Sequence, residues 1–459
     1  MSERLLVMRR IIGVCLAKAN SEFSREFIKN LHSVALKKDV KIIVYNSVCE
    51  ISDPNKNKGA RSVFYNIPYD KLCAVVILYG AVAEPTLVER IIKDAKNSNV
   101  PVIMARKYDP RCISVIGEYL DEYTEMLKKI IKDRNITDSV YVAGKNKPEV
   151  DYDSKLRIQC YKNALEDCGQ EFKLDNLYFG QFWEMPTLDV AKKILKNRDK
   201  MPDAVFCAND LMAQMIIKEF QENNIRVPED VVVTGFDGTE CYRCSSPNIT
   251  TCLERMDELS EKIFEAIDDA QNDKTLSNAY YYKYEAIYSE SCGYPNAMDD
   301  SVQMTGRRLY DLMRFNRIDE EYSGYWIDGI LENPCLNNFY KKIPDFVSDK
   351  ICIAMTPVQI AKVITHNYHA LEDNLVLYAR DESSNLPRAD RFLTKYMTPD
   401  FENWLEDSSV CYISSLFVDD NCYGVIYERS FSPDKFGYSA HRHAVMLNNA
   451  LLICVKSEK

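Results

Sequence analysis

Apolar residues in the first two thirds of the chain follow two alternating patterns. Short unbroken runs, such as residues 11–16 and 73–78, are separated by longer stretches in which apolar residues recur every three or four positions. Unbroken runs are typical of strands buried on both faces, and the recurring spacing is typical of amphipathic helices. Because the two patterns alternate, the sequence predicts parallel sheets with helices on both faces.

The expected strands fall into two groups. The run at 114–117 is predicted to be the first crossing into a second lobe, and the run that begins at Asn248 is predicted to return to the first lobe. The strands expected up to residue 233 are 11–16, 40–46, 73–78, 100–104, 114–117, 139–143, 177–179, 204–207 and 231–233.

Polar residues follow two of these strands directly. Asn209 and Asp210 come after the strand at 204–207, and Asp237 follows the strand at 231–233. Ligands of open parallel sheets bind beyond the carboxyl ends of the strands, so Asn209 and Asp237 are candidates for binding a polyol. The alternative is that Asn209 only caps a helix and Asp237 only forms a turn.

The pattern changes after residue 295. A helix is expected at 301–315, strands at 351–355, 374–378, 410–417 and 423–427, and a closing helix at 441–456. The last two strands are predicted to form an antiparallel hairpin, because Asp420 and Asn421 are typical turn residues. This α+β arrangement is similar to a GAF-type sensory domain, and we place a domain boundary between residues 295 and 296.

Composition narrows the class of protein. The 459 residues are 46% hydrophobic and 28% charged, with a formal net charge of −11. An acidic balance gives no support to nonspecific nucleic-acid binding, and no apolar run reaches the ~20 residues that a membrane helix needs. The charged and then apolar beginning could be a signal peptide, but residues 11–16 are needed as a strand. Sixteen scattered cysteines favour reduced thiols in the cytoplasm.

Signals of catalysis or metal binding are weak. Cys241 and Cys244 have C-x-x-C spacing without a second pair, and His366 and His369 lack the H-E-x-x-H arrangement. We find no glycine-rich nucleotide-binding motif and no nucleophile elbow. The expectation is therefore a protein without metal or cofactor that is not an enzyme.

Three segments carry a resemblance to a known family. They are A-N-D-L-M-A at 208–213, V-P-E-D-V at 227–231 and G-F-D at 235–237. In this order and spacing they resemble the effector-binding core of the lac repressor family, which is related to periplasmic sugar-binding proteins. E-S-C-G-Y-P at 290–295 resembles the last strand of that core. The resemblance covers roughly residues 11–295.

The resemblance implies a type I periplasmic-binding-like domain of two lobes over residues 1–295, which closes around a small-molecule effector. Residues 296–459 would then form a sensory or relay domain, and the chain would be a homodimer. Members of the family carry a DNA-reading helix-turn-helix before the first strand, whereas only ten residues precede Ile11 here. We therefore expect no direct DNA binding by this chain.

Further site residues are implied by the family pattern. Arg157 would project from a helix into the cleft, and Phe182 with Trp183 would stack on the ligand. Phe23 would form a second wall. The alternative for each is an ordinary surface residue. An arginine supplies a rigid fork of donors, and an aromatic ring suits the apolar face of a sugar or a base.

Arg106 departs from the family, which commonly has an aspartate after the fourth strand. Gly117, Glu118 and Tyr119 stand where the family has an Asp-Asn pair. A reversed charge at a ligand wall should change what binds. The ligand is then anionic or is not a simple neutral sugar, or the pocket has lost its ligand.

These inferences predict an intracellular sensor that transmits ligand binding to an output, either transcription regulation or cyclic-dinucleotide signalling. Two alternatives stay open. The first is a ligand-independent dimerisation or scaffold module of a transcription regulator. The second is an enzyme on a doubly wound fold.

Overall fold

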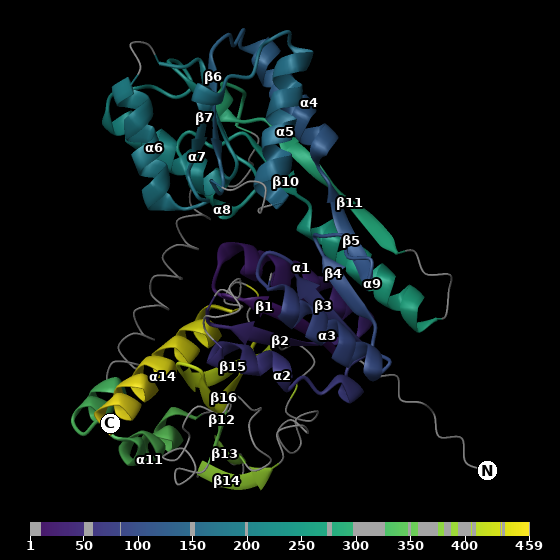
Figure 1. Ribbon diagram of the computed structural model, residues 1–459, viewed down its shortest axis with the longest axis vertical. Coiled ribbons are helices and arrows are strands. Elements are labelled where there is room, and N and C mark those ends of the chain that lie inside the picture. Colours follow the sequence, from purple (N-terminus) through teal and green to yellow (C-terminus); the bar gives the residue numbers. More distant parts are fainter. Residues whose placement is uncertain are drawn as a thin grey trace. The chain divides into compact units, whose positions relative to one another are not determined.

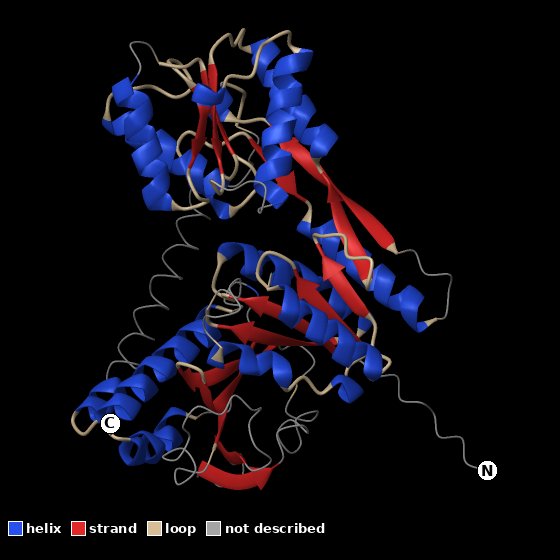
Figure 2. Cartoon of the chain, in the orientation of Figure 1, coloured by secondary structure: helices blue, strands red, loops and turns tan. Residues whose placement is uncertain are grey.

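The computed structural model describes fourteen stretches of the chain, drawn in colour in Figure 1 and by secondary structure in Figure 2. Two compact units are formed. Unit 1 comprises Met1–Ile116, Met256–Tyr280 and Tyr310–Lys459, and unit 2 comprises Gly117–Arg255 and Tyr281–Leu309. The described stretches are 11–49, 58–82, 84–146, 152–197, 201–272, 278–296, 326–347, 350–356, 375–380, 387–392, 405, 410–431, 433 and 437–458.

Unit 1 contains a parallel sheet in the order β5-β4-β3-β1-β2. The strands are buried apolar runs, as the sequence predicts, and the helices that connect them are amphipathic. The strands are β1 (Ile11–Ala17), β2 (Lys41–Ser47), β3 (Ala74–Leu78), β4 (Val102–Ala105) and β5 (Ile113–Glu118), and the helices are α1 (Glu22–Lys38), α2 (Ser62–Tyr65), α3 (Pro85–Asn97) and α9 (Met256–Gln271).

The sheet of unit 1 does not end at β2. β15 (Val410–Val418) pairs with β2 in parallel, with Val410 opposite Ile42 and Ser414 opposite Asn46. Beyond β15 the order continues as β16-β12-β13-β14, and each of these pairs is antiparallel. Figure 1 shows β15 beside β2. The further strands are β12 (Ile351–Met355), β13 (Leu375–Arg380), β14 (Pro387–Phe392) and β16 (Asn421–Ser430).

A shared core holds the two parts of this sheet together. Ile43 and Tyr45 of β2 belong to the same buried cluster as Cys411 and Ile413 of β15 and Tyr427 of β16. A second cluster lies under α11 (Leu336–Phe346) and α14 (Tyr438–Ser457). The β15–β16 hairpin is confirmed, and β14 and α11 were not predicted.

The segment after residue 310 is thus grouped with the first lobe in one compact unit. The predicted boundary at residue 295 and the GAF-type identity of residues 296–459 stay predictions. The helix expected at 301–315 lies outside the described residues.

Unit 2 contains a parallel sheet in the order β7-β6-β8-β9. β10 (Thr251–Glu254) and β11 (Ala279–Ile287) form an antiparallel pair beside it. The chain passes between the units within β5, between β10 and α9, and within β11; the first two passages lie close to the predicted crossings, and the third was not predicted. Its other elements are β6 (Ser139–Ala143), β7 (Leu177–Phe179), β8 (Ala204–Cys207), β9 (Val232–Thr234), α4 (Leu120–Asp133), α5 (Tyr152–Asp167), α6 (Glu184–Asn197), α7 (Asp210–Glu222) and α8 (Glu240–Cys244).

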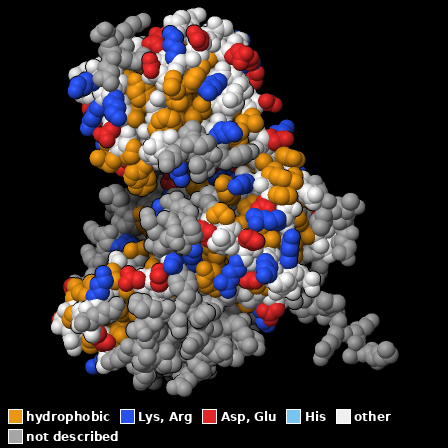
Figure 3. All heavy atoms as spheres, viewed as in Figure 1, with side chains coloured by type: hydrophobic (Ala, Val, Ile, Leu, Met, Phe, Trp, Pro, Cys, Tyr) orange, Lys and Arg blue, Asp and Glu red, His pale blue; other side chains and the backbone are white. Residues whose placement is uncertain are grey.

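The surface carries charges of both signs. On the face drawn in Figure 3, the Lys and Arg side chains lie among Asp and Glu side chains. Within the described residues, no helix combines the length and the apolar character that crossing a membrane requires.

Candidate functional site

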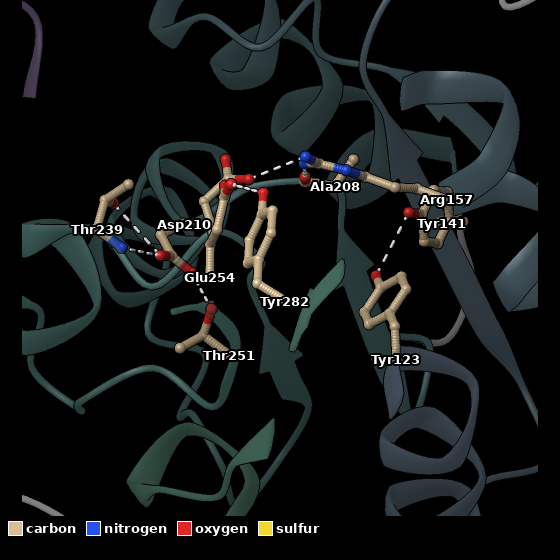
Figure 4. A network of polar contacts seen from close by, with 10 residues as sticks. Tyr123, Tyr141, Arg157, Ala208, Asp210, Thr239, Thr251, Glu254 and Tyr282 are labelled. Atoms are coloured by element: carbon tan, nitrogen blue, oxygen red, sulfur yellow. Dashed lines mark hydrogen bonds and ion pairs between the residues drawn. The ribbon is translucent and has the colours of Figure 1, made fainter. Parts of the chain in front are cut away.

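Arg157 and Asp237 form an ion pair at the carboxyl ends of the strands of unit 2. Nη2 of Arg157 donates to Oδ1 of Asp237 across 2.9 Å. Its Nη1 donates to the carbonyl oxygen of Ala208, and Figure 4 labels both Arg157 and Ala208. Arg157 is 3% exposed, and the Asp237 side chain is 18% exposed. The predicted arginine and aspartate, which lie 80 positions apart, therefore come together at the strand ends.

Electrostatics keep this arginine charged. Burial acts to lower the pKa of Arg157, but the combined attraction of the Asp237 and Asp153 carboxylates and of nearby tyrosines outweighs it, so the pKa is raised. The Nε atom of Arg157 is buried and has no hydrogen-bond partner among the described residues. The site thus combines a fixed cation with one unused donor.

Aromatic rings surround the guanidinium. The Cζ atom of Arg157 lies 3.9 Å from the ring centroid of Phe236 and 5.8 Å from that of Phe182. The Phe182 ring packs over Gly144 so closely that any side chain at residue 144 would overlap it. Phe182 is the predicted stacking residue, and Phe236 was not predicted, although it stands inside the G-F-D motif.

Two other predicted residues take different places. Asn209 is the N-cap of α7, where its Oδ1 accepts from the backbone N–H of Met212 at 2.9 Å. Its capping role, the alternative stated for it, is therefore observed, and its contact with a ligand stays a prediction. Trp183 is 61% exposed just before α6, and its carbonyl oxygen accepts from the hydroxyl of Thr187.

Asp210 positions the loop that carries Asp237, a role the sequence did not predict. It is fully buried, and its Oδ2 accepts from the backbone N–H of Thr239 at 2.7 Å while its Oδ1 accepts from the hydroxyl of Thr251 at 2.6 Å. Its own N–H donates to the carbonyl oxygen of Phe236. Figure 4 shows Asp210 between Thr239 and Thr251. The aspartate of the A-N-D motif was the available signal.

Phe23 and Arg106 come together in unit 1. The Cζ atom of Arg106 lies 4.4 Å from the ring centroid of Phe23, a cation–π arrangement. Phe23 lies in the first turn of α1, and Arg106 directly follows β4. Phe23 and Arg106, which were predicted separately as wall residues, are therefore neighbours at the strand ends of this unit.

Backbone strain marks three of the predicted residues. Arg106, Phe182 and Asp237 have φ angles of 75°, 57° and 92°, in the left-handed region that non-glycine residues seldom adopt. Such conformations cost roughly 1–3 kcal/mol each and gather at functional sites. Hydrogen bonds hold Asp237 in place, because its N–H donates to Cys252 and its carbonyl oxygen accepts from Glu254.

The cysteines and histidines with metal-like spacing do not form a metal site within the described part of the chain. Cys241 and Cys244 lie on α8, and no group of three or more His, Cys, Asp or Glu side chains that could hold a metal ion occurs among the described residues. His366, His369 and Glu372 lie outside the described residues.

Residues 131–283 match the family model described as a periplasmic binding protein-like domain. Catabolite control protein A of Priestia megaterium is 22% identical over 270 residues, which cover 58% of this chain and 77% of that protein. The HTH-type transcriptional repressor PurR of Vibrio atlanticus (strain LGP32) is 30% identical over 135 residues, which cover 29% of this chain and 40% of that repressor. The match therefore spans less than half of PurR.

Solved structures show the same fold. The dimeric Lac repressor with an 11-residue C-terminal deletion superimposes with a TM-score of 0.53 at 18% identity, covering 62% of this chain and all of that chain. A complex of the transcriptional regulator CelR with cellobiose gives a TM-score of 0.52 at 16% identity, covering 61% of this chain and 84% of that chain. The fold is thus the two-lobed type I periplasmic-binding-like fold, as predicted.

The chain therefore contains a periplasmic-binding-protein-like domain and has homologues in the lac repressor family, which the three sequence motifs predicted. The ligand-binding roles of Phe23, Arg106, Arg157, Phe182, Trp183, Asn209 and Asp237 stay predictions.

Proposed function

We propose that this protein is a ligand-responsive regulator that binds a small polar effector at the carboxyl ends of the unit 2 strands. The observation that carries the proposal is the buried Arg157–Asp237 pair beside the ring of Phe182. A guanidinium with an unused Nε–H and a partly exposed carboxylate supply donors and acceptors next to an apolar ring. This combination suits a hydroxyl-rich ligand.

The ligand class follows from these groups. An aromatic face packs against the C–H face of a sugar ring, while charged groups hydrogen-bond to its hydroxyls. We therefore propose a sugar or a sugar acid. The CelR structure, a cellobiose complex with the same fold, supports a sugar-like compound.

We propose transcription control as the output, through a homodimer in the cytoplasm. The names of PurR and CelR describe transcriptional regulators, and the Lac repressor structure is a dimer. Neither a cyclic-dinucleotide output nor catalysis has comparable support. That this chain does not itself bind DNA stays a prediction.

A thermal-unfolding panel of sugars, sugar acids, nucleosides and amino acids tests the ligand. A ligand at 100 times its dissociation constant should stabilise the protein by about 2.7 kcal/mol. Asp237→Asn and Arg157→Lys should abolish the shift, because each removes the charge or the planar fork that the ligand needs. Asp230→Asn, in the exposed Arg226–Asp230 pair, is the matched control and should keep the shift.

Three results would contradict the proposal. No shift with any compound favours the scaffold alternative. Turnover of a panel compound favours the enzyme alternative. A shift that persists in both site variants removes Arg157 and Asp237 from the binding site.

A further inference from the structure

Asn46 joins three segments of unit 1 that are far apart in the sequence. It lies near the end of β2 and is fully buried. Its Oδ1 accepts from the backbone N–H of Ala19 at 3.0 Å, and its Nδ2 donates to the hydroxyl of Ser414 at 3.0 Å. Because the Ala19 N–H can only donate, the orientation of the Asn46 amide is determined.

The first of these partners belongs to the turn between β1 and α1. Ala19 is buried in that turn, and Ser21, two residues later, caps α1 by accepting from the N–H of Ser24 at 3.2 Å. Phe23 follows in the first helical turn and stacks on Arg106. The conformation of the turn therefore decides where Phe23 lies.

The second partner belongs to the C-terminal segment. Ser414 lies on β15, opposite Asn46 in the parallel pairing of β15 with β2. The start of α14 approaches the same turn: any side chain at Gly437, whose φ is +73°, would overlap the carbonyl oxygen of Ala19. The Cζ atom of Arg25 on α1 also lies 5.6 Å from the ring centroid of Tyr438.

We propose that Asn46 is a positioning residue through which the C-terminal segment, by which we mean β15 and the start of α14, sets the conformation of the β1–α1 turn and thus the place of Phe23. Ser414 holds the Asn46 amide in the orientation that accepts from Ala19. When Ser414 cannot accept, Nδ2 of Asn46 is left buried without its partner, the amide turns away, and Ala19 loses its acceptor.

The neighbouring serine provides a matched control. Ser415 is also buried on β15, but it faces the opposite side of the sheet, where its hydroxyl accepts from that of Ser62 at 2.7 Å. Ser414→Ala removes a buried hydrogen bond between β15 and β2, and Ser415→Ala removes a buried hydrogen bond between β15 and α2. Only Ser414→Ala removes a hydrogen bond of Asn46, the residue that accepts from Ala19 in the β1–α1 turn.

Hydrogen exchange of the full-length protein, followed by mass spectrometry, tests the proposal. Ser414→Ala should speed exchange in peptides covering residues 18–24 by about fivefold, the effect of one net hydrogen bond, although Ser414 itself does not contact Ala19. Ser415→Ala should leave exchange in 18–24 unchanged while it speeds exchange around Ser62. If Ser414→Ala does not fold, Ser414→Cys fills the site with a slightly larger side chain and weakens the hydrogen bond.

Equal exchange in residues 18–24 for the Ser414 and Ser415 variants would overturn the proposal. The exchange comparison needs no ligand. It therefore decides this proposal even when the compound panel gives no shift, and a negative panel counts against the proposed function alone.

Discussion

Units 1 and 2 share a strand–helix architecture but differ at the edges of their parallel sheets. The parallel sheet of unit 2 runs from β7 to β9, and the chain at the end of β9 meets the chain around β10 only through two isolated parallel bridges, Thr234–Thr250 and Asp237–Leu253. In unit 1 the β2 edge continues through β15 into an antiparallel sheet, and the two parts share one core. The unpaired N–H and C=O groups at a strand edge form hydrogen bonds with any strand that lies beside it. The pairing of β15 with the β2 edge therefore joins the C-terminal strands to the rest of the unit 1 sheet.

The two units also differ in the polar groups that lie at the ends of their strands. In unit 2, Arg157 and Asp237 neutralise each other beside aromatic rings. In unit 1, the neutral amide of Asn46 links the first lobe to the C-terminal segment. A ligand at the first location competes with or completes an ion pair, whereas a change at the second is passed along a sheet. The predictions below test this contrast.

The largest effect is expected from Asp237→Ala in unit 2. Removing the carboxylate leaves Arg157 buried without its partner, which should cost about 3–5 kcal/mol of unfolding free energy. Urea denaturation measures the loss. Asp230→Ala, in an exposed ion pair of the same unit, should cost no more than about 1 kcal/mol. Similar small losses for both variants would show that the buried pair is not a distinct element of unit 2.

Acid should weaken unit 1 through His441. Burial, helped by the nearby charge of Lys18, lowers the pKa of His441 from 6.5 to about 4. The unfolded chain therefore takes up the proton first, so stability is complete above pH 6.5 and falls as the pH drops towards 4. The loss at pH 4 should approach about 3 kcal/mol, at 1.36 kcal/mol per pKa unit.

His441→Leu provides the control, because it removes the titrating group from α14. Urea midpoints measured between pH 7 and pH 4 should fall less steeply in this variant than in the unchanged protein. Identical slopes would show that His441 does not stay neutral where α14 packs against the sheet.

The smallest effect compares two glycines, one in each unit. Gly437 of unit 1 and Gly169 of unit 2 have φ angles of +73° and +72°. Alanine at either position carries the left-handed penalty of about 1 kcal/mol. Only at residue 437 would the new Cβ also overlap a neighbour, the carbonyl oxygen of Ala19, whereas no atom lies within 4 Å of the Cβ position at residue 169.

Thermal unfolding should therefore show a larger loss for Gly437→Ala than for Gly169→Ala, by roughly 1–2 kcal/mol. Equal losses of unfolding free energy would mean that α14 moves away from the β1–α1 turn at no cost. In that case the contact between the C-terminal segment and the first lobe would be looser than the contrast between the units requires.

Local pattern was sufficient for most elements. The runs at 204–207 and 351–355 coincide with β8 and β12, because buried strands need continuous apolar sequence. β14, with Arg388, Asp390 and Arg391 among its six residues, carries no such run and was not predicted.

For the candidate site, position after a strand located Arg106, Asn209 and Asp237, since the carboxyl ends of parallel strands meet at one edge. The roles of Phe236 and Asp210 were not predicted. Both roles consist of contacts with residues distant in the sequence, and spacing along the chain carries no information about such contacts. The same is true of Asn46.

The order of strands and helices and the family motifs at 208–213, 227–231 and 235–237 were determined by the sequence alone, because periodicity and short-range turn chemistry are written into adjacent residues. The pairing of β15 with β2, the Arg157–Asp237 contact and the bridge through Asn46 were decided only by the tertiary structure. Backbone ladders between strands use the same N–H and C=O groups in every residue, so the choice of partner depends on which buried side chains fit together across hundreds of positions.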